Sequence, residues 1–160
     1  AVGISTRQSD VAIAIAERAP IDFIMMAGSY TLLCHEPLEA LFPFCRTRQI
    51  SVFIASPFNS GILATGSLES PFDYAPAAPE IRAKVTRMNA ICARHAVPIA
   101  AAALQFPLYH SAVASIVTGQ GNENEIRANL AALDLIIPAD FWAEMKAEGV
   151  IPADAPTRYP

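Results

Sequence analysis

The fold of this chain is decided by residues 50–61, which read Ile50-Ser-Val-Phe-Ile-Ala-Ser-Pro-Phe-Asn-Ser-Gly61. Their first half is rich in β-branched, aromatic and other apolar residues, which is typical of a buried strand. Pro57 ends that strand, because proline has no N–H with which to continue a β-ladder. The second half is small and polar, so its backbone can approach a ligand closely and its side chains can hydrogen-bond to one. The stretch therefore predicts a buried strand that opens into a binding loop.

Shorter apolar runs on either side of this stretch repeat the pattern. They occupy residues 1–5, 21–26 and 113–117, and helix-periodic segments separate them. Strands that alternate with helices predict an α/β fold with a parallel sheet. Because four strands are few, two architectures stay open, namely a small doubly wound sheet and half of an eight-stranded barrel. The helices are expected at residues 9–18, 37–48, 79–95, 99–109, 122–133 and 138–146.

Local signals refine the limits of these elements. Ser9 or Asp10 can cap the first helix, and Pro43 can kink the second. Residues 57–78 hold several Pro and Gly residues and are expected to form one long loop. The tail, residues 152–160, is expected to be irregular.

The composition describes a globular chain with little net charge. Of its 160 residues 53% are hydrophobic and 16% are charged, and the formal net charge is −4. This composition excludes a disordered chain and argues against a nucleic-acid partner, since there is no basic excess to neutralise phosphates. The length suits one domain, 1–160, but falls short of the roughly 250 residues of a complete (β/α)8 barrel.

The sequence also predicts the compartment. The most apolar stretch, residues 98–108, is shorter than the about 20 residues needed to cross a bilayer, so no membrane partner is expected. Three cysteines without a CxxC pair favour a reducing cytoplasm over a disulfide scaffold. Residues 1–5 lack an initiator Met and a basic region, so the chain is expected to begin inside a strand and not with a signal peptide.

Small and polar residues follow all four predicted strands. The last of these segments, Thr118-Gly-Gln-Gly-Asn122, joins a strand to the amino end of a helix. Free N–H groups and the helix dipole favour an anion there, although the segment can equally be an ordinary glycine-rich turn. Asn124 stands where the dinucleotide fingerprint GxGxxG needs its third glycine, so that motif is not met.

Motifs that would identify an α/β-hydrolase or a nucleoside triphosphatase are missing from the sequence. The chain has neither GxSxG nor a Walker P-loop. Cys34 and His35 have no second pair at metal-ligand spacing, so no metal site is expected. His95 is expected at a helix end, where a cation suits the dipole, and His110 at the amino-terminal side of a strand, away from the reaction face of a barrel.

Five stretches resemble the aldo-keto reductases, in particular their aldose/L-fucose dehydrogenase-like branch. The resemblance implies a (β/α)8 TIM barrel that interconverts a carbonyl and an alcohol with a nicotinamide cofactor. It also implies that the chain corresponds to strands five to eight with their helices, that is, to the C-terminal half of the barrel. The family's catalytic Asp, Tyr, Lys and His lie in the other half, so no catalytic residue is assigned and the chain alone is expected to be inactive. The stretches are residues 26–33, 56–66, 74–81, 98–108 and 117–130.

The resemblance carries over half of a cofactor site. Ser5 matches the residue that hydrogen-bonds to the nicotinamide carboxamide. Two further groups of residues, given at the end of this paragraph, match the loop around the pyrophosphate and the segment at the adenosine end, respectively. Small residues, Ala27 and Ala55, stand where many members have Gln and an aromatic ring. NADP-preferring members have cations at Gly119 and Glu125, so the resemblance implies NAD, with NADP the less favoured cofactor. The two groups are Ser56, Pro57, Phe58, Ser60 and Gly61, and Gly119, Gln120, Gly121, Asn122, Glu125 and Asn129.

Three interpretations follow for the whole molecule. The chain is expected to be part of an oxidoreductase that acts on a small carbonyl or sugar substrate, with Phe72 and Tyr74 near its pocket. Alternatively, it is a module that closes a barrel with the missing N-terminal half or with a second copy of itself, since a half barrel has two free sheet edges. A third alternative is an open, flavodoxin-like α/β protein that binds a phosphate-bearing cofactor without catalysis.

Overall fold

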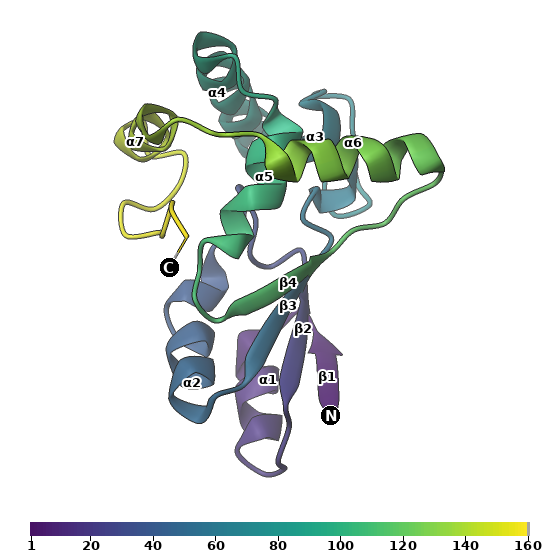
Figure 1. Cartoon of the computed structure of the whole chain (residues 1–160), viewed down its shortest axis with the longest axis vertical. Coiled ribbons are helices and arrows are strands. Elements are labelled where there is room, and N and C mark those ends of the chain that lie inside the picture. The colour runs from purple at the N-terminus through teal and green to yellow at the C-terminus, as the bar shows by residue number, and fades with distance from the viewer. Residues whose placement is uncertain (160) are drawn as a thin grey trace.

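The computed structural model describes residues 1–159, which include a four-stranded parallel sheet (Figure 1). Residue 160, the last of the tail, lies outside the described residues. The strands are β1 (Gly3–Thr6), β2 (Phe23–Ala27), β3 (Ser51–Ala55) and β4 (Val113–Val117), and they lie side by side in that order. Each strand pairs in parallel with the next, and a crossover that contains a helix joins them. The predicted α/β class with a parallel sheet is therefore confirmed.

Most of the predicted helices form with nearly the predicted limits. Pro79 is the first residue of α4, and Pro98 and Pro138 directly precede α5 and α7, because the N–H groups at the start of a helix have no partner within the helix. The helices are α1 (Ser9–Ala16), α2 (Leu41–Arg48), α3 (Ile62–Thr65), α4 (Pro79–His95), α5 (Ile99–Leu108), α6 (Glu123–Asp134) and α7 (Ala139–Ala147).

Three local predictions are corrected. Gln8, not Ser9 or Asp10, precedes α1, and the Ser9 hydroxyl instead donates a hydrogen bond of 2.6 Å to Glu36. The segment predicted as one helix over 37–48 is a 3-10 turn, Glu36–Leu38, followed by α2. Pro43 causes no kink, since it lies in the first turn of α2, where its missing N–H has little effect.

The loop predicted for residues 57–78 is shorter than expected. It contains a 3-10 turn, Asn59–Gly61, that leads directly into the short helix α3. The remainder ends in an isolated antiparallel bridge between Phe72 and Ala75. Residues 152–159 of the tail contain neither helix nor strand.

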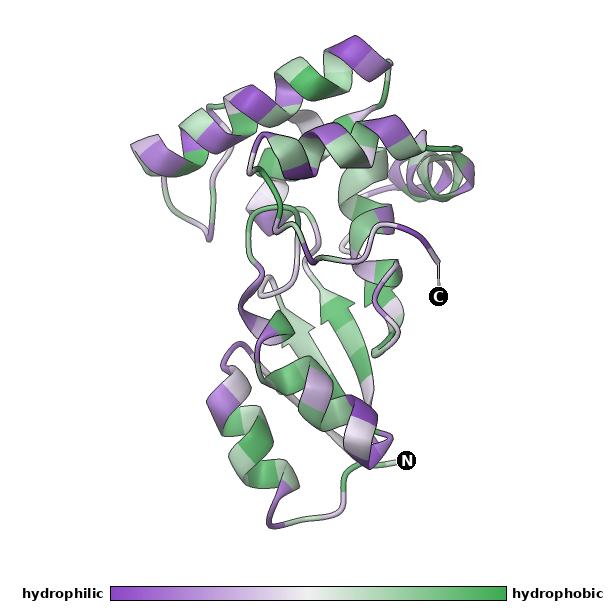
Figure 2. Ribbon diagram, turned by 90° about the vertical axis from the view of Figure 1, so that its left-hand side faces the viewer, coloured by the Kyte–Doolittle hydropathy of each residue, from purple (hydrophilic) through white to green (hydrophobic). Residues whose placement is uncertain are grey.

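The two faces of the sheet differ in burial. Helices α1 and α2 cover one side of the sheet (Figures 1 and 2). Ile24, Met26, Val52 and Ile54 are fully buried, and they belong to one hydrophobic core with residues of α1 and α2. Residues that alternate with them are only partly buried, and the rings of Phe23 and Phe53 stack there at 5.1 Å. In the described part of the chain, no helix covers this second face (Figure 1).

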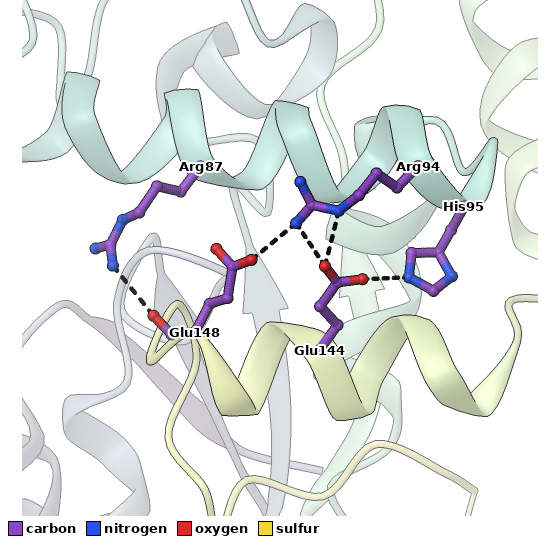
Figure 3. Close-up of polar contacts among 5 residues, drawn as sticks. All are labelled: Arg87, Arg94, His95, Glu144 and Glu148. Carbon is purple, nitrogen blue, oxygen red and sulfur yellow. Dashed lines mark hydrogen bonds and ion pairs between the residues drawn. The ribbon is translucent and has the colours of Figure 1, made fainter.

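Helices α3 to α7 lie beyond the carboxyl ends of the strands (Figure 1). Among them, α4 and α7 run side by side and are joined by charged side chains (Figure 3). Glu144 contacts His95 Nε2 at 2.5 Å and accepts a hydrogen bond from Arg94 Nε at 2.8 Å. The contact with His95, followed by that with Arg94, lowers the pKa of Glu144. Glu148 pairs with Arg94 at 2.8 Å. His95 does lie at a helix end as predicted, but its ring contacts a carboxylate of the neighbouring helix.

Among residues 1–159 there is no single helix long and apolar enough to cross a membrane. Helices α4 and α5 meet the length and composition criteria only as a pair, and that pair is bent by 100°.

Candidate functional site

A cleft of about 590 Å³ lies beyond the carboxyl end of β3. One wall is the segment 56–61 with α3, and the opposite wall is α6, from Glu125 to Ala132, with Gly119 and with Ala100 of α5. The cleft is mostly apolar, and its polar groups come from a few side chains and from backbone. Its lining consists of Ser56, Pro57, Phe58, Asn59, Ser60, Gly61, Ala64, Thr65, Tyr74, Ala100, Gly119, Glu125, Ala128, Asn129 and Ala132.

The first wall has an unusual backbone. Ser56, Asn59, Ser60 and Gly61 all have positive φ values, of 55°, 46°, 62° and 110°. Residues other than glycine rarely adopt such values, and strained backbone of this kind concentrates at ligand sites because the surrounding structure must hold it. An added Cβ at Gly61 would meet no atom within 4 Å, so this glycine is needed for its backbone angle and leaves open space toward the cleft.

Hydrogen bonds hold this strained segment in place. The Ser56 N–H donates to the Val117 carbonyl at 3.2 Å, which ties the segment to the end of β4. Asn59 is 5% exposed, and its Nδ2 donates to the Gly28 carbonyl at 3.2 Å. The Ser60 hydroxyl accepts the N–H of Tyr74 at 3.1 Å. The wall is therefore pre-formed by contacts from three other segments.

The opposite wall is organised by a capping box at the start of α6. The Asn122 side chain accepts the Glu125 N–H at 3.1 Å, and Glu125 in turn accepts the Gly121 N–H at 2.8 Å and the Asn122 amide at 2.8 Å. Such reciprocal bonds satisfy the free N–H groups of a helix terminus. The amino end of the helix favours a negative charge, and here the Glu125 carboxylate supplies it. The same carboxylate lies in the lining of the cleft.

The structure brings most of the predicted cofactor residues together. Eight of them line this one cleft, although they come from segments more than 55 residues apart: Ser56, Pro57, Phe58, Ser60, Gly61, Gly119, Glu125 and Asn129. Four predicted residues lie outside its lining. Gln120, Gly121 and Asn122 belong to the adjoining turn, where two of them hold Glu125, and Ser5 is exposed on β1.

A smaller cleft of about 110 Å³ continues from the first toward β1 and β2. It shares four residues with the larger cleft and adds Arg7 and Asp73, whose side chains form an ion pair at 2.5 Å. This pair joins the end of β1 to the segment before α4 and raises the pKa of Arg7. The shared residues are Ser56, Asn59, Ser60 and Tyr74.

Sequence reasoning missed several residues of this site. Asn59, Arg7 and Asp73 were not predicted to take part, and only the small polar character of 56–61 pointed toward Asn59. Tyr74 was predicted near the substrate, and it does line both clefts, 85% exposed. Its partner in the substrate prediction, Phe72, lines neither of them.

The chemical groups of the site suit binding better than proton transfer. Neither lining contains a histidine or a lysine, and the larger cleft has one carboxylate, Glu125. The three histidines lie elsewhere; burial lowers the pKa of His35 to about 4 and that of His110 to about 4. No group of three or more His, Cys, Asp or Glu residues within 1–159 could hold a metal ion.

Comparison with known proteins identifies the family. Residues 1–148 match the model of the aldo/keto reductase family. The chain is 42% identical over 136 residues to pyridoxal 4-dehydrogenase of Microbacterium luteolum, covering 84% of this chain and 40% of that protein. It is 36% identical over 154 residues to D-threo-aldose 1-dehydrogenase of a Pseudomonas species, covering 95% and 47%. The chain therefore belongs to the aldo/keto reductase family, and it spans less than half the length of these relatives.

Solved structures agree on the fold. An aldo-keto reductase of Bacillus halodurans, in its holo form, superposes with a TM-score of 0.70 at 22% identity. The superposition covers 98% of this chain and 52% of the other. The α/β class and the parallel sheet are thus shared with that protein.

Proposed function

We propose that this chain provides the pyrophosphate- and adenosine-binding part of a nicotinamide cofactor site in an oxidoreductase of the aldo/keto reductase family. The proposal rests on one observation, namely that the strained 56–61 segment and α6 line the same cleft of about 590 Å³. A volume of this size suits a small-molecule or cofactor site. The membership of the family and the names of two dehydrogenases among its relatives support the same function.

The residues present fit a dinucleotide. Ser56 and Ser60 would hold the pyrophosphate through their hydroxyl groups, with Gly61 leaving room beside them, and Glu125 with Asn129 would hold the adenosine end. Ser5 at the end of β1 would receive the carboxamide of the nicotinamide, on the open side of the sheet. When bound, the nicotinamide ring supplies hydride transfer, for which this chain offers binding and orientation.

We further propose NAD in preference to NADP. The Glu125 carboxylate faces the cleft, and the capping box fixes it there with two hydrogen bonds of 2.8 Å. Its charge repels a 2′-phosphate and can accept a hydrogen bond from a ribose hydroxyl. The nearest cation of this helix, Arg127, is paired with Glu123 and does not line the cleft.

The half-barrel proposal has its own support. The sheet has two free edges, β1 and β4, and an uncovered face that carries Phe23, Met25 and Phe53. Partly exposed aromatic residues on a sheet face favour association. We propose that this face becomes the interior of a barrel when a further half joins it, and that the intact protein acts on a small carbonyl or sugar substrate with catalytic groups from that half. The chain alone is expected to be inactive.

Fluorescence titration with NADH and NADPH tests the cofactor proposal on the full chain. We expect saturable binding that favours NADH by about tenfold, the ratio that 1.4 kcal/mol represents. The Glu125→Gln variant should reduce this preference, because it keeps a hydrogen-bond acceptor for the Gly121 N–H but loses the charge. Glu123→Gln is the matched control, since Glu123 lies on the same helix outside the cleft.

Equal binding of both nucleotides by the unmodified chain would refute the NAD preference, and no binding of either would refute a self-sufficient cofactor site. Light scattering tests the half-barrel separately. A dimer supports closure by a second copy, and a stable monomer that stays monomeric at high concentration counts against it.

A further inference from the structure

A second large cleft, of about 730 Å³, lies at a different place in the molecule from the cofactor cleft. It lies between the end of α2, the segment just before β4, the end of α7 and the tail. No residue of its lining belongs to either cleft of the candidate functional site. The segment before β4 is at the amino end of that strand, so this base cleft, as we name it, is at the opposite end of the strand from the proposed cofactor site.

The base cleft gathers cations for which residues 1–159 supply no partner. The chain has eleven Lys and Arg residues. Eight of them pair with a carboxylate or donate a hydrogen bond to a carbonyl: Arg7, Arg18, Arg48, Arg82, Lys84, Arg87, Arg94 and Arg127. Within residues 1–159, the three that remain are Arg46, Lys146 and Arg158, and all three line the base cleft.

This distribution is not expected from the composition. The chain has fifteen acidic residues, so partners for these three cations are plentiful. Among residues 1–159, Asp154 is the one acidic side chain that lines the base cleft, and it forms no ion pair with any of the three cations. Like charges that share a cleft repel one another, and an anion placed between them converts that repulsion into attraction.

Uncharged donors lie beside the cations. His110 accepts the N–H of Ala112 on its Nδ1 at 3.1 Å, so its proton is on Nε2 and available to a ligand. Its ring is held by Phe42, at a centroid distance of 4.2 Å. His110 and Arg46 also line a smaller adjoining hollow, which places the two side chains next to each other.

The remaining wall is aromatic and carries hydroxyl groups. The rings of Tyr109 and Tyr159 meet edge to face at a centroid distance of 4.9 Å. Ser111 is exposed at the mouth of the cleft. The combination of cations, neutral donors and an aromatic wall is typical of sites for phosphorylated or carboxylated small molecules.

We propose that the base cleft binds a small polyanion that carries two or more phosphate or carboxylate groups. Arg46, Lys146 and Arg158 neutralise its charge, and His110 donates a hydrogen bond from Nε2. The proposal does not depend on the cofactor site, since the two clefts share no residue.

Calorimetric titration of the full chain with sodium pyrophosphate at low ionic strength tests the proposal, and a titration with citrate distinguishes phosphate from carboxylate recognition. With the cofactor cleft saturated by NADH, we expect one bound anion per chain. Arg46→Gln and Lys146→Gln should each weaken binding by about tenfold, which corresponds to 1.4 kcal/mol. Arg127→Gln changes the net charge by the same amount far from the base cleft and should change the affinity by less than about twofold.

A second measurement locates the anion. Pyrophosphate should shift the His110 imidazole signals in an NMR spectrum, and it should do so equally in the presence of saturating NADH. Three results overturn the proposal. The first is no binding at low ionic strength, and the second is equal weakening by Arg127→Gln and Arg46→Gln, which attributes the effect to net charge alone. Displacement of the anion by NADH also overturns it, since that assigns the anion to the cofactor cleft. Circular dichroism shows whether each variant is folded, and Lys146→Gln stands in if Arg46→Gln is not.

Discussion

The buried hydroxyl of Tyr30 leads to a prediction with an uncommon sign. Tyr30 is fully buried, with its ring against Phe42 at 4.7 Å and Phe106 at 5.1 Å. Its hydroxyl has no hydrogen-bond partner among the described residues. A buried hydroxyl without a partner costs about 1–3 kcal/mol, because water no longer solvates it. Tyr30→Phe removes the hydroxyl and keeps the ring, so we expect the free energy of unfolding to rise by about 1–2 kcal/mol.

Tyr109 supplies the matched control. It is also buried, but its hydroxyl donates to Gln105 Oε1 at 2.9 Å. Gln105 in turn donates to the carbonyls of Ala132 and Leu135, at 2.9 and 2.8 Å, so the tyrosine belongs to a satisfied network. Tyr109→Phe should therefore lower the free energy of unfolding by about 1 kcal/mol.

Urea denaturation monitored by circular dichroism measures both changes in the free energy of unfolding, and thermal denaturation measures the corresponding changes in Tm. For a chain of this length 1 kcal/mol corresponds to about 3 °C in Tm, so Tyr30→Phe should melt about 3–6 °C higher and Tyr109→Phe about 3 °C lower. A Tyr30→Phe variant that is less stable than the unmodified chain by more than about 0.5 kcal/mol would refute the reasoning. It would show that the Tyr30 hydroxyl has a partner, such as a buried water.

Three further predictions concern backbone strain, acid and capping. Gly66 has φ +73°, and an added Cβ would lie 2.4 Å from Asn89 Oδ1, so Gly66→Ala should lower the free energy of unfolding by about 2–3 kcal/mol in urea denaturation. Gly149 has φ +62° but open space around it, so Gly149→Ala should lower that free energy by about 1 kcal/mol. Burial lowers the pKa of His35 to about 4, so the unfolded chain binds the extra proton first, and stability should fall by up to about 3 kcal/mol as the pH drops from 6.5 to 4. His35→Gln should reduce that pH dependence and leave the part contributed by His110, and an unchanged slope would contradict the assignment. Asn122→Ala removes the cap of α6 and should cost about 1 kcal/mol, measured by the same denaturation, with a wild-type midpoint counting against the capping role.

Local chemistry made much of the fold predictable from the sequence. Strand 113–117 and helix 79–95 have the predicted limits, because apolar runs and a starting proline act within a few residues. The helix predicted at 37–48 was too long, since helical spacing of apolar residues continues across the break at Glu39 and Ala40. The end of α4 at Ala96, a left-handed residue that is not glycine, has no signal in the sequence beyond the following Val97-Pro98.

The candidate site was predictable only where its residues are close in sequence. The 56–61 segment and the start of α6 each carry a recognisable composition. Arg7 and Asp73 meet across 66 positions, and nothing near either residue indicates the other. The same holds for the base cleft, because Arg46, Lys146 and Arg158 are scattered along the chain and only the folded structure shows that they share a cleft.

The capping box at α6 has a consequence for how this protein can evolve. Glu125 takes part both in the stability of the helix and in the charge presented to the proposed nucleotide. Mutation of Glu125 to Lys or Arg would attract a 2′-phosphate. It would also leave the Gly121 N–H without its acceptor and put a positive charge at the positive end of the helix dipole. A cation at position 125 that reverses the cofactor preference therefore also destabilises the start of α6, whereas the uncharged Gln only weakens the preference.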